Sequence, residues 1–518
     1  MDKDQTQTEK AIRTGPLFGV MFIGAFIAFL NQTLINIALP QLMEHFHIEA
    51  ATADWLITIY MLVNGIVIPI TAFLLERFTT RQLYIACMSF FTIGTFICAI
   101  APGFYTILIG RVVQAVGAGI LMPLITNVIF TLFPPHKRGA AMGTLGIAIN
   151  FAPAIGPTLS GWIVQTYSWR LLFYIVFPIA LANLVFSFFF IKNVSETSRP
   201  QLDVWSVIFS TIGFGGVLYS FATAGIKGWS DSLVITMLLI GGISLILFIW
   251  RQFAVKNPIL EFRIFRYPMF SLTTVINVIV TMALFSGMIL IPIYMQHVRG
   301  FSPLVSGLML LPGGILMGLM SPITGRLFDK IGAKWLSVTG LVITVITTYA
   351  LTDLDTETSF GYVTGIYTAR MFGMALLMMP IFTAGLNALP LSLNRHGTAM
   401  VNTMRMMAGA VGMAFFVTVM TNQTAAHMKE IAAEQHVAST NQMIMMKSQA
   451  TADVRDFTVG PHIASSTERE MALVAQATVM GIDDAFMIAT FLTVVSLLLA
   501  FFIKNANPEK DEPSTSKT

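Results

Sequence analysis

The chain has 518 residues, of which 55% are hydrophobic and only 11% are charged. A soluble domain carries roughly 25% charged residues, so this composition excludes an ordinary soluble protein. The formal net charge of +4 is too small to indicate a nucleic-acid partner.

Apolar runs of about 20 residues recur along the chain, and each is long enough to cross a bilayer. Residues 1–13 are polar and of mixed charge, so they lack the layout of a cleavable signal peptide. The sequence therefore predicts an all-α, multi-pass membrane protein with fourteen transmembrane helices. In chain order, the predicted spans are 17–39, 54–74, 82–101, 105–132, 140–164, 171–191, 204–225, 232–250, 270–296, 304–324, 335–352, 361–387, 399–421 and 483–503.

Lysine and arginine are distributed unevenly between the two sides of the predicted membrane. If both termini are cytoplasmic, 20 of the 30 basic residues fall in cytoplasmic segments. The short external loops then hold only Arg170, Lys227 and Arg299. This asymmetry follows the positive-inside rule, and it supports an even number of spans with both termini in the cytoplasm.

The chain contains a weak internal duplication, with an offset of 253–259 residues. Arg111 in the fourth span corresponds to Arg370 in the twelfth, and each is followed by a Met-Pro pair. Repeated halves with a site between them are typical of transporters, in which one half rocks against the other. Two further pairs of segments correspond, namely 74–81 with 325–334 and 138–142 with 395–400.

The duplication predicts two six-helix units, and the seventh and eighth spans form an inserted pair between them. The long polar segment 422–482 is predicted to be external, where residues 425–437 form an amphipathic helix of a small cap. The predicted units are a cytoplasmic N-terminus (1–16), a first six-helix bundle (17–192), the inserted helices with flanking cytoplasmic segments (193–269), a second six-helix bundle that includes the external loop (270–503), and a cytoplasmic tail (504–518).

Residues 143–161, in the fifth span, read GTLGIAINFAPAIGPTLSG. One face of that helix has little side-chain bulk and is bent by prolines, which favours close approach to a partner helix. The tenth span offers a complementary pair of small residues at Gly314 and Gly318, so we predict that the fifth and tenth spans touch. The small face of the fifth span comprises Gly146, Asn150, Pro153 and Pro157.

Together, these features resemble the major facilitator superfamily, and the fourteen spans resemble its drug:proton antiporter branch of the QacA/EmrB type. The resemblance covers essentially the whole chain. It implies a major facilitator fold, with two six-helix bundles and two inserted helices, in the bacterial cytoplasmic membrane. The fifth span matches the antiporter signature G-x-x-x-N-x-x-P-x-x-G-P-x-x-x-G of that family through Gly146, Asn150, Pro153, Gly156, Pro157 and Gly161.

The cytoplasmic loop signature of the superfamily, G-x-L-a-D-R-x-G-R-K, is well matched by residues 325–334. Its first-half copy is eroded, since Glu76 replaces Asp and Thr79 replaces Gly. In the family, the acidic residue and its basic neighbours hold the two halves together on the cytoplasmic side. Ordinary positive-inside anchoring is the alternative. The resemblance implies gate residues at Glu76, Arg77, Arg81, Gly325, Arg326, Asp329 and Lys330.

Arg111 and Gln114 resemble the fourth-span signature R-x-x-Q-G-x-G, with Ala115 where the family has Gly. An arginine within a span is costly unless it is paired or reaches water. The family links this residue to proton transfer or to the electrostatics of the cavity. The residues alone leave open a structural link to backbone carbonyls. Arg370 and Arg405 are candidates for the same role.

The first span departs from the family pattern. Asn31 stands where the family has an acidic residue, and an amide cannot carry a proton as a carboxylate can. No carboxylate lies near the middle of any predicted span. Asp54, at the external start of the second span and ahead of the aromatic residue Tyr60, is the candidate proton carrier, with capping of that span as the alternative. The other carboxylates nearest to a span are Asp483 and Asp484.

The sequence predicts a proton-coupled multidrug efflux antiporter that exports amphiphilic small molecules by alternating access. Arg111, Arg370 and Arg405 favour neutral, zwitterionic or anionic substrates. The alternative is a flippase for a lipid or cell-envelope precursor on the same fold. No phosphate-binding loop, metal-spaced His/Cys cluster or nucleophile signature supports an enzyme, a sensor or an ATP-driven pump. We expect a bilayer-embedded monomer that uses the proton gradient, without cofactor, metal or nucleic acid; a dimer is the alternative.

Overall fold

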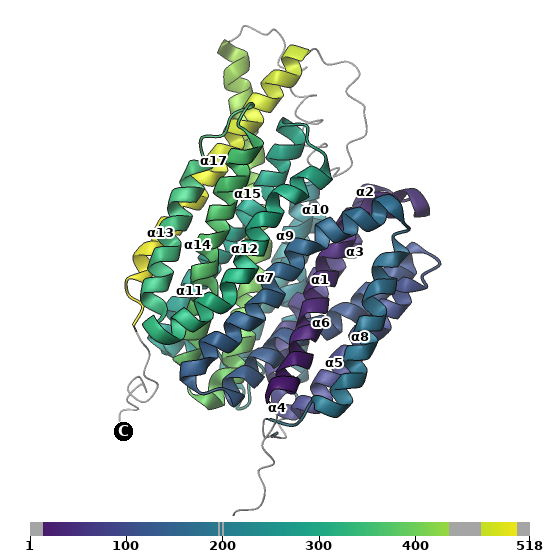
Figure 1. Ribbon diagram of the computed structural model, residues 1–518, viewed down its shortest axis with the longest axis vertical. Coiled ribbons are helices and arrows are strands. Elements are labelled where there is room, and N and C mark those ends of the chain that lie inside the picture. The colour runs from purple at the N-terminus through teal and green to yellow at the C-terminus, as the bar shows by residue number, and fades with distance from the viewer. Residues whose placement is uncertain (1–13, 195–196, 199–200, 435–467, 505–518) are drawn as a thin grey trace, which may run out of the picture.

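The computed structural model describes residues 14–194, 197–198, 201–434 and 468–504. In this part of the chain every regular element is a helix, and fourteen helices are long and apolar enough to cross a membrane. The predicted all-α class and the number of spans are therefore confirmed. Successive spans alternate in direction, so α1 (Thr14–Phe46) begins and α17 (Glu468–Ala500) ends at the same end of the molecule (Figure 1). We call this end the base and the opposite end the top.

The first bundle consists of six spans with an apolar core of their own. Its helices are α1, α2 (Ala50–Ala53), α3 (Trp55–Val67), α4 (Thr71–Arg77), α5 (Thr80–Ala99), α6 (Phe104–Leu132), α7 (Pro135–Thr166) and α8 (Arg170–Phe190). The second span is divided into α3 and α4 because Pro69, in a short 3-10 turn, has no backbone N–H to continue the helix. A capping box formed by Thr79 and Gln82 then starts α5 immediately after the turn at the base.

The second bundle also has six spans and a separate apolar core. Its helices are α11 (Pro268–Ile293), α12 (Pro303–Ile331), α13 (Ala333–Ala350), α14 (Phe360–Asn387), α15 (Asn394–Glu434) and α17. In Figure 1, α15 and α17 rise above the other helices at the top. Their projecting parts pack through Met428, Ile431 and Ala477, and His427 Nε2 lies 2.8 Å from Asp484 Oδ2.

The projecting parts correct two sequence-based boundaries. Residues 425–434 are helical as predicted, but they continue α15 without a break and do not form a separate helix; residues 435–437 lie outside the described residues. The last span was predicted to begin at residue 483, whereas α17 begins at Glu468 and is apolar enough to span from Leu473. Neither helix contains a proline, so the hydropathy pattern marks where the chain enters the membrane and not where the helix ends.

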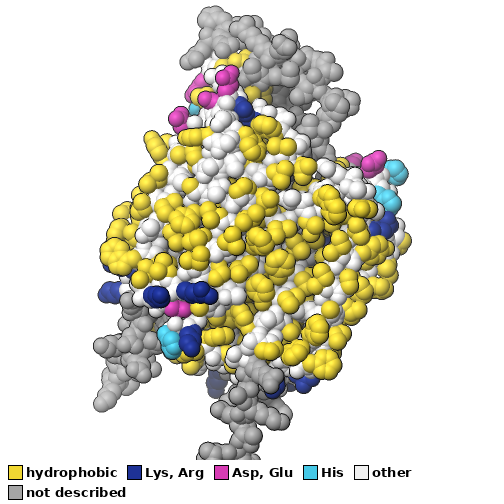
Figure 2. Space-filling view, viewed as in Figure 1, with side chains coloured by type: hydrophobic (Ala, Val, Ile, Leu, Met, Phe, Trp, Pro, Cys, Tyr) yellow, Lys and Arg dark blue, Asp and Glu magenta, His cyan; other side chains and the backbone are white. Residues whose placement is uncertain are grey.

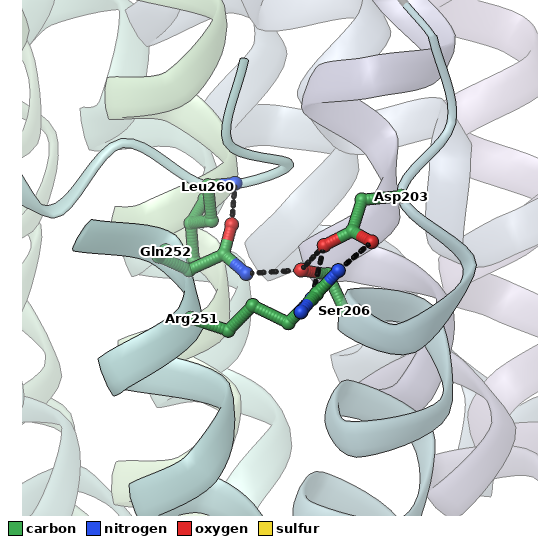
Figure 3. Close-up of polar contacts among 5 residues, drawn as sticks. All are labelled: Asp203, Ser206, Arg251, Gln252 and Leu260. Carbon is green, nitrogen blue, oxygen red and sulfur yellow. Dashed lines mark hydrogen bonds and ion pairs between the residues drawn. The ribbon is translucent and has the colours of Figure 1, made fainter. Parts of the chain in front are cut away.

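The inserted pair consists of α9 (Val204–Lys227) and α10 (Ser232–Ala254), which are joined at the base by a polar network (Figure 3). Arg251 holds Asp203 through two contacts of 2.6 and 2.7 Å, and this pairing lowers the pKa of the Asp203 carboxyl. Ser206 Oγ donates to the same carboxylate at 2.6 Å and accepts from Gln252 Nε2 at 2.7 Å. Gln252 in turn accepts from the backbone N–H of Leu260 at 3.2 Å, so the network also fixes the segment that follows α10.

Helix α9 contacts both bundles. On the first bundle, the rings of Tyr219 and Trp55 stack with centroids 5.7 Å apart. On the second bundle, Nε1 of Trp229, just after α9, donates to Thr418 Oγ1 on α15 at 2.7 Å. The inserted pair therefore covers one of the lines along which the two bundles meet.

The surface agrees with a protein embedded in a bilayer. Figure 2 shows hydrophobic side chains covering most of the visible face, with dark blue Lys and Arg side chains gathered mainly toward the base. Large apolar residues such as Phe189, Ile246 and Phe491 are 72%, 68% and 66% exposed. Exposure of this kind is unfavourable in water but favourable against lipid.

Candidate functional site

Arg111, on α6, is fully buried and is held by acceptors from three helices of the first bundle. Its Nε donates to the carbonyl oxygen of Leu56 at 3.1 Å, and its Nη1 donates to Gln114 Oε1 at 3.2 Å. Nη1 also lies 3.4 Å from Asn31 Oδ1 on α1. The guanidinium carbon is 4.1 Å from the ring centroid of Tyr60, a cation–π contact. The structure thus places the predicted residues Asn31, Tyr60 and Gln114 around Arg111.

The surroundings of Arg111 are neutral. Gln114 is oriented by its own Nε2, which donates to Thr95 Oγ1 at 2.8 Å. Within the described residues Arg111 has no carboxylate partner, and its Nη2 has no acceptor. The geometry is that of a cation linking α1, α3 and α6 through backbone and amide oxygens, which is the structural alternative that the sequence left open.

Arg370, on α14, has an equivalent arrangement in the second bundle and is also fully buried. Its Nε donates to Thr348 Oγ1 at 3.1 Å, and its Nη2 donates to the carbonyl oxygen of Ala283 and to Ser286 Oγ, the latter at 3.4 Å. Its Nη1 has no acceptor within the described chain and faces the bare Cα of Gly287, where a Cβ would overlap the guanidinium. The two corresponding arginines therefore each tie helices together within one bundle.

Arg405, on α15, differs from both. Its side chain is half-buried, and across the described residues it makes no hydrogen bond, ion pair or ring contact. The structure does not bring it into the Arg111 or the Arg370 cluster.

Asp54 immediately precedes α3 near the top of the first bundle. Its backbone is helical, and its carboxylate makes no capping bond to the backbone but accepts from Thr58 Oγ1 at 3.0 Å. Burial raises the pKa of the Asp54 carboxyl, and the bond from Thr58 opposes this in part. Asp54 is not among the contacts of Arg111, so these two predicted residues are not paired.

Helix α7 runs between α12 of the second bundle and α1 of its own bundle. Asn150 Nδ2 donates to Ser321 Oγ on α12 at 3.1 Å. A Cβ on Gly146 would lie 2.8 Å from the Cβ of the same Ser321, so the glycine is required for the close approach. A Cβ on Gly314 would overlap Ala154, and one on Gly318 would lie 2.7 Å from the Cβ of Phe151. The fifth and tenth spans are therefore in direct contact along these small residues.

Two of the six signature residues on α7 also face α1. A Cβ on Gly156 would overlap Thr33 Oγ1, and one on Gly161 would lie 3.8 Å from Ile37 and 3.0 Å from Leu304. Near Gly161, Ser160 Oγ donates to the carbonyl of Leu34 at 2.5 Å. At the same level, Pro157 lies on the face of α7 that contacts α12. Its Cβ is 3.8 Å from the position that a Cβ on Gly307 would take. The signature thus makes α7 fit closely against two helices, and not against α12 alone.

At the base, polar contacts made by three side chains join the two bundles in the described part of the chain. Asp329, at the end of α12, accepts from the backbone N–H groups of Gly139 and Ala140 on α7, at 2.9 and 2.8 Å. Glu76 Oε1, at the end of α4, lies 3.1 Å from Nε2 of His396, at the start of α15.

The third contact runs from Arg138 Nη1 to Asn387 Oδ1, at 2.8 Å. The apolar core of the first bundle also continues at this end into Phe382, Leu386 and Met400 of the second bundle. The bundles are therefore closed against each other at the base by both polar and apolar contacts.

The basic members of the predicted gate play a smaller part. Arg77, Arg326 and Lys330 are exposed, and within the described chain they make no hydrogen bond or ion pair. Arg81 donates from Nη2 to the carbonyl of Phe188 at 2.7 Å, a contact inside the first bundle. Gly325 is needed for packing, because a Cβ there would overlap the carbonyl of Gly139.

Sequence reasoning missed His396, Asn387, Ser321 and Thr33. A signal existed for His396, since it lies in segment 395–400, which echoes 138–142. The counterparts of the echo, Arg138 and His396, both join the bundles at the base. No comparable pattern marks Ser321 or Thr33, because a hydroxyl on a membrane helix is more often bonded to its own helix.

Apart from the contact between bundles, an apolar groove of about 280 Å³ lies among α1, α7 and α8. Phe26, Leu159 and Val176 line it, one from each helix. Ile23 and Ile179 also line it and are each 44% exposed, so the groove opens on the outer surface of the first bundle. In the described part of the chain, no group of three or more His, Cys, Asp or Glu side chains is arranged to hold a metal ion.

Comparison with known proteins finds matches along most of the chain. The family described as Major Facilitator Superfamily matches residues 21–413. An uncharacterized MFS-type transporter, YhcA of Bacillus subtilis, is 46% identical over 95% of this chain and 93% of its own length. The lincomycin resistance protein LmrB of Bacillus subtilis is 42% identical over 94% of this chain and 95% of its own length. The crystal structure of the human organic anion transporter MFSD10 superposes with a TM-score of 0.60 at 14% identity, covering 92% of this chain and 99% of that one, which concerns the fold alone.

Proposed function

The chain belongs to the Major Facilitator Superfamily, and from that premise we propose that it is a drug exporter that moves amphiphilic molecules out of the cell in exchange for protons. The observation that carries the proposal is the 42% identity to a lincomycin resistance protein over nearly the full length of both chains. The fold and the contact between the bundles are what such an exporter needs.

The proposed orientation has the base in the cytoplasm. The Lys and Arg side chains that are visible in Figure 2 lie mainly toward the base, and cytoplasmic loops of membrane proteins carry an excess of such residues. With this orientation, the contacts made by Asp329, Glu76 and Arg138 close the cytoplasmic side. Breaking them opens a path from the cytoplasm while α7 and α12 remain the axis of rocking.

Proton coupling requires a group that gains and loses a proton during transport. Arginine does not titrate in the physiological range, so Arg111 and Arg370 contribute fixed charge. Asp54 is the proposed proton carrier because it is a half-buried carboxyl at the start of α3 whose pKa is raised by burial.

The test is transport into proteoliposomes under an imposed pH gradient, with lincomycin and a panel of cationic, neutral and anionic drugs. Uptake that follows the gradient, and that stops when an ionophore collapses it, supports antiport. Uptake that does not depend on the pH gradient would rule out proton antiport, and the protein would still be an exporter.

A fluorescent lipid is included in the same assay. Transport of the lipid with no transport of any drug would replace the proposed function by a lipid flippase. Liposomes without protein give the background for each compound.

A further inference from the structure

The three arginines within spans differ in what surrounds them. Arg111 and Arg370 are fully buried, and each is held by carbonyl, amide or hydroxyl oxygens of its own bundle. Arg405 is half-buried, and over the residues that the structure describes it has no hydrogen bond, ion pair or ring contact. Its cation is therefore available to a group that these residues do not supply.

Arg405 lies on the face of α15 that is turned toward α11. Residues 405, 409 and 412 share a helical face because they are spaced by four and three. A Cβ on Gly409 would lie 2.9 Å from the ring of Phe285, and one on Gly412 would lie 2.9 Å from Cα of Met282, both on α11. Arg405 is about 17 Å along α15 from its base end, which is roughly half the thickness of a bilayer core.

The neighbours of Arg405 along α15 place it where the bundles meet. Met404 and Met407 pack against the apolar cluster in which residues of the first bundle meet Met400 and Val401 of α15. Met406 Cγ lies 3.6 Å from where a Cβ on Gly65, in α3, would stand. Arg405 is thus on a helix that contacts both bundles, flanked by flexible thioether side chains that adapt to apolar ligands.

We propose that Arg405 binds the anionic group of the exported amphiphile, a carboxylate, sulfonate or phosphate, while the adjoining methionine side chains contact its apolar body. The inference rests on the proposed function, because it requires the substrate to pass between the bundles. A cation within a span is unfavourable unless it is paired or hydrated, and an anionic ligand pairs it with charge-assisted hydrogen bonds. Arg405 keeps its charge at physiological pH, so it is an anchor for substrate and not a proton carrier.

The test uses two fluorescent probes that differ by one carboxylate, dansyl-leucine and its methyl ester. Binding to the full chain in neutral detergent micelles is measured by fluorescence titration. We expect the native protein to bind the acid roughly 10–100-fold more tightly than the ester, the range of a hydrogen bond to a charged group. Arg405→Gln abolishes this preference, and Arg405→Lys keeps part of it. Arg266→Gln, the same change at an exposed site before α11, keeps it in full.

An acid preference that persists in Arg405→Gln would overturn the inference. Export of both probes and of a cationic dye from proteoliposomes separates this result from failure of the proposed function. If the native protein exports the ester or the cation but neither binds nor exports the acid, the inference is wrong and the exporter stands. If it exports no compound at all, the proposed function falls and the inference with it. Thermal melting checks that Arg405→Gln folds, and Arg405→Met, which matches the neighbouring side chains, replaces it if it does not.

Discussion

Arg111 and Arg370 occupy corresponding places in the two halves, and both are buried cations held by neutral oxygens. Each donates to a backbone carbonyl of another helix, that of Leu56 for Arg111 and that of Ala283 for Arg370. A carbonyl oxygen has two lone pairs, so it can accept from arginine while it also serves its own helix. Each arginine therefore links helices within its bundle.

Replacing Arg111 should therefore destabilise the fold before it changes specificity. Arg111→Met removes the donors to Leu56, Gln114 and Asn31, and each of the two amide oxygens, on Gln114 and Asn31, that is left unpaired costs about 1–3 kcal/mol. We expect a lower unfolding midpoint in detergent, with partial recovery in Arg111→Lys. An unchanged midpoint together with lost proton coupling would contradict this and favour the role in proton transfer.

The burial of Asp54 predicts how stability and transport depend on pH. Its pKa is raised, so its contribution to stability is present below the ordinary pKa of an aspartate and is lost as pH rises through the raised value. Asp54→Asn should remove this loss and flatten the pH profile of drug export over the same interval. The measurements are the unfolding midpoint and the transport rate as functions of pH. Export that keeps its full pH dependence in Asp54→Asn would exclude Asp54 as the proton carrier.

Residue patterns named the members of the Arg111 cluster as candidates, but they did not indicate the polar contacts between the bundles at the base. Asn31, Tyr60 and Gln114 were recognisable because each belongs to a dense motif on a single span. The pairing of Glu76 with His396 joins positions 320 residues apart, and neither flanking motif specifies the other. Likewise, helical periodicity indicates a small face on α7, but only the packed structure shows that the face divides between α12 and α1.

At the scale of elements, α7 belongs to the first bundle but contacts the second bundle along its whole length. Backbone N–H groups in its first turn donate to Asp329 of α12, and Asn150 in its middle donates to Ser321. Its upper part packs against Gly307 and Leu304 of α12. Contact along the whole length of the helix is compatible with rocking about it, because small residues let the backbones roll without exposing a cavity.

A cysteine pair across this contact should form a disulfide. The Cβ of Pro157 and a Cβ built on Gly307 are 3.8 Å apart, the mean Cβ separation in disulfides. Pro157→Cys with Gly307→Cys should therefore cross-link on mild oxidation, stop export, and recover export on reduction. The readout is the mobility of the linked protein after proteolytic cleavage between α7 and α12, together with transport.

The matched control moves one cysteine by two residues along α7. Leu159 lines the groove among α1, α7 and α8, so Leu159→Cys with Gly307→Cys should not cross-link. The native Cys87 and Cys98 are buried in the first bundle and provide a low background. Equal cross-linking of both pairs would mean that α7 rotates freely, contrary to the fitted packing on two sides.

At the scale of the whole molecule, closure at the base has an approximate two-fold symmetry. Asp329 and Glu76 are counterparts in the duplication, and each accepts from the beginning of a helix in the opposite bundle. Asp329 uses backbone N–H groups at the start of α7, whereas Glu76 uses the ring of His396 on α15. The duplicated sequence predicted paired acidic gates, but the exchange of a backbone donor for a histidine could not be inferred from either half alone.

This arrangement predicts that Asp329 and Glu76 contribute independently to the free energy of closure at the base, so that their contributions add. Hydrogen bonds to charged groups contribute about 1.5–3 kcal/mol, so each of Asp329→Asn and Glu76→Gln should raise the population open at the base by roughly tenfold or more. The gates lie at different helix pairs and share no partner, so their free energies should sum in the double variant. Spin labels on Lys137→Cys and Leu391→Cys, exposed at the base of the two bundles, report the opening as a longer distance.

The control for this measurement is Asp203→Asn, which breaks an ion pair at the base but within the inserted helices. It should leave the distance distribution unchanged, because this ion pair joins α9 to α10 and does not join either labelled bundle to the other. A double variant of Glu76 and Asp329 that also leaves the distribution unchanged would show that the apolar contacts of Phe382, Leu386 and Met400 hold the base closed.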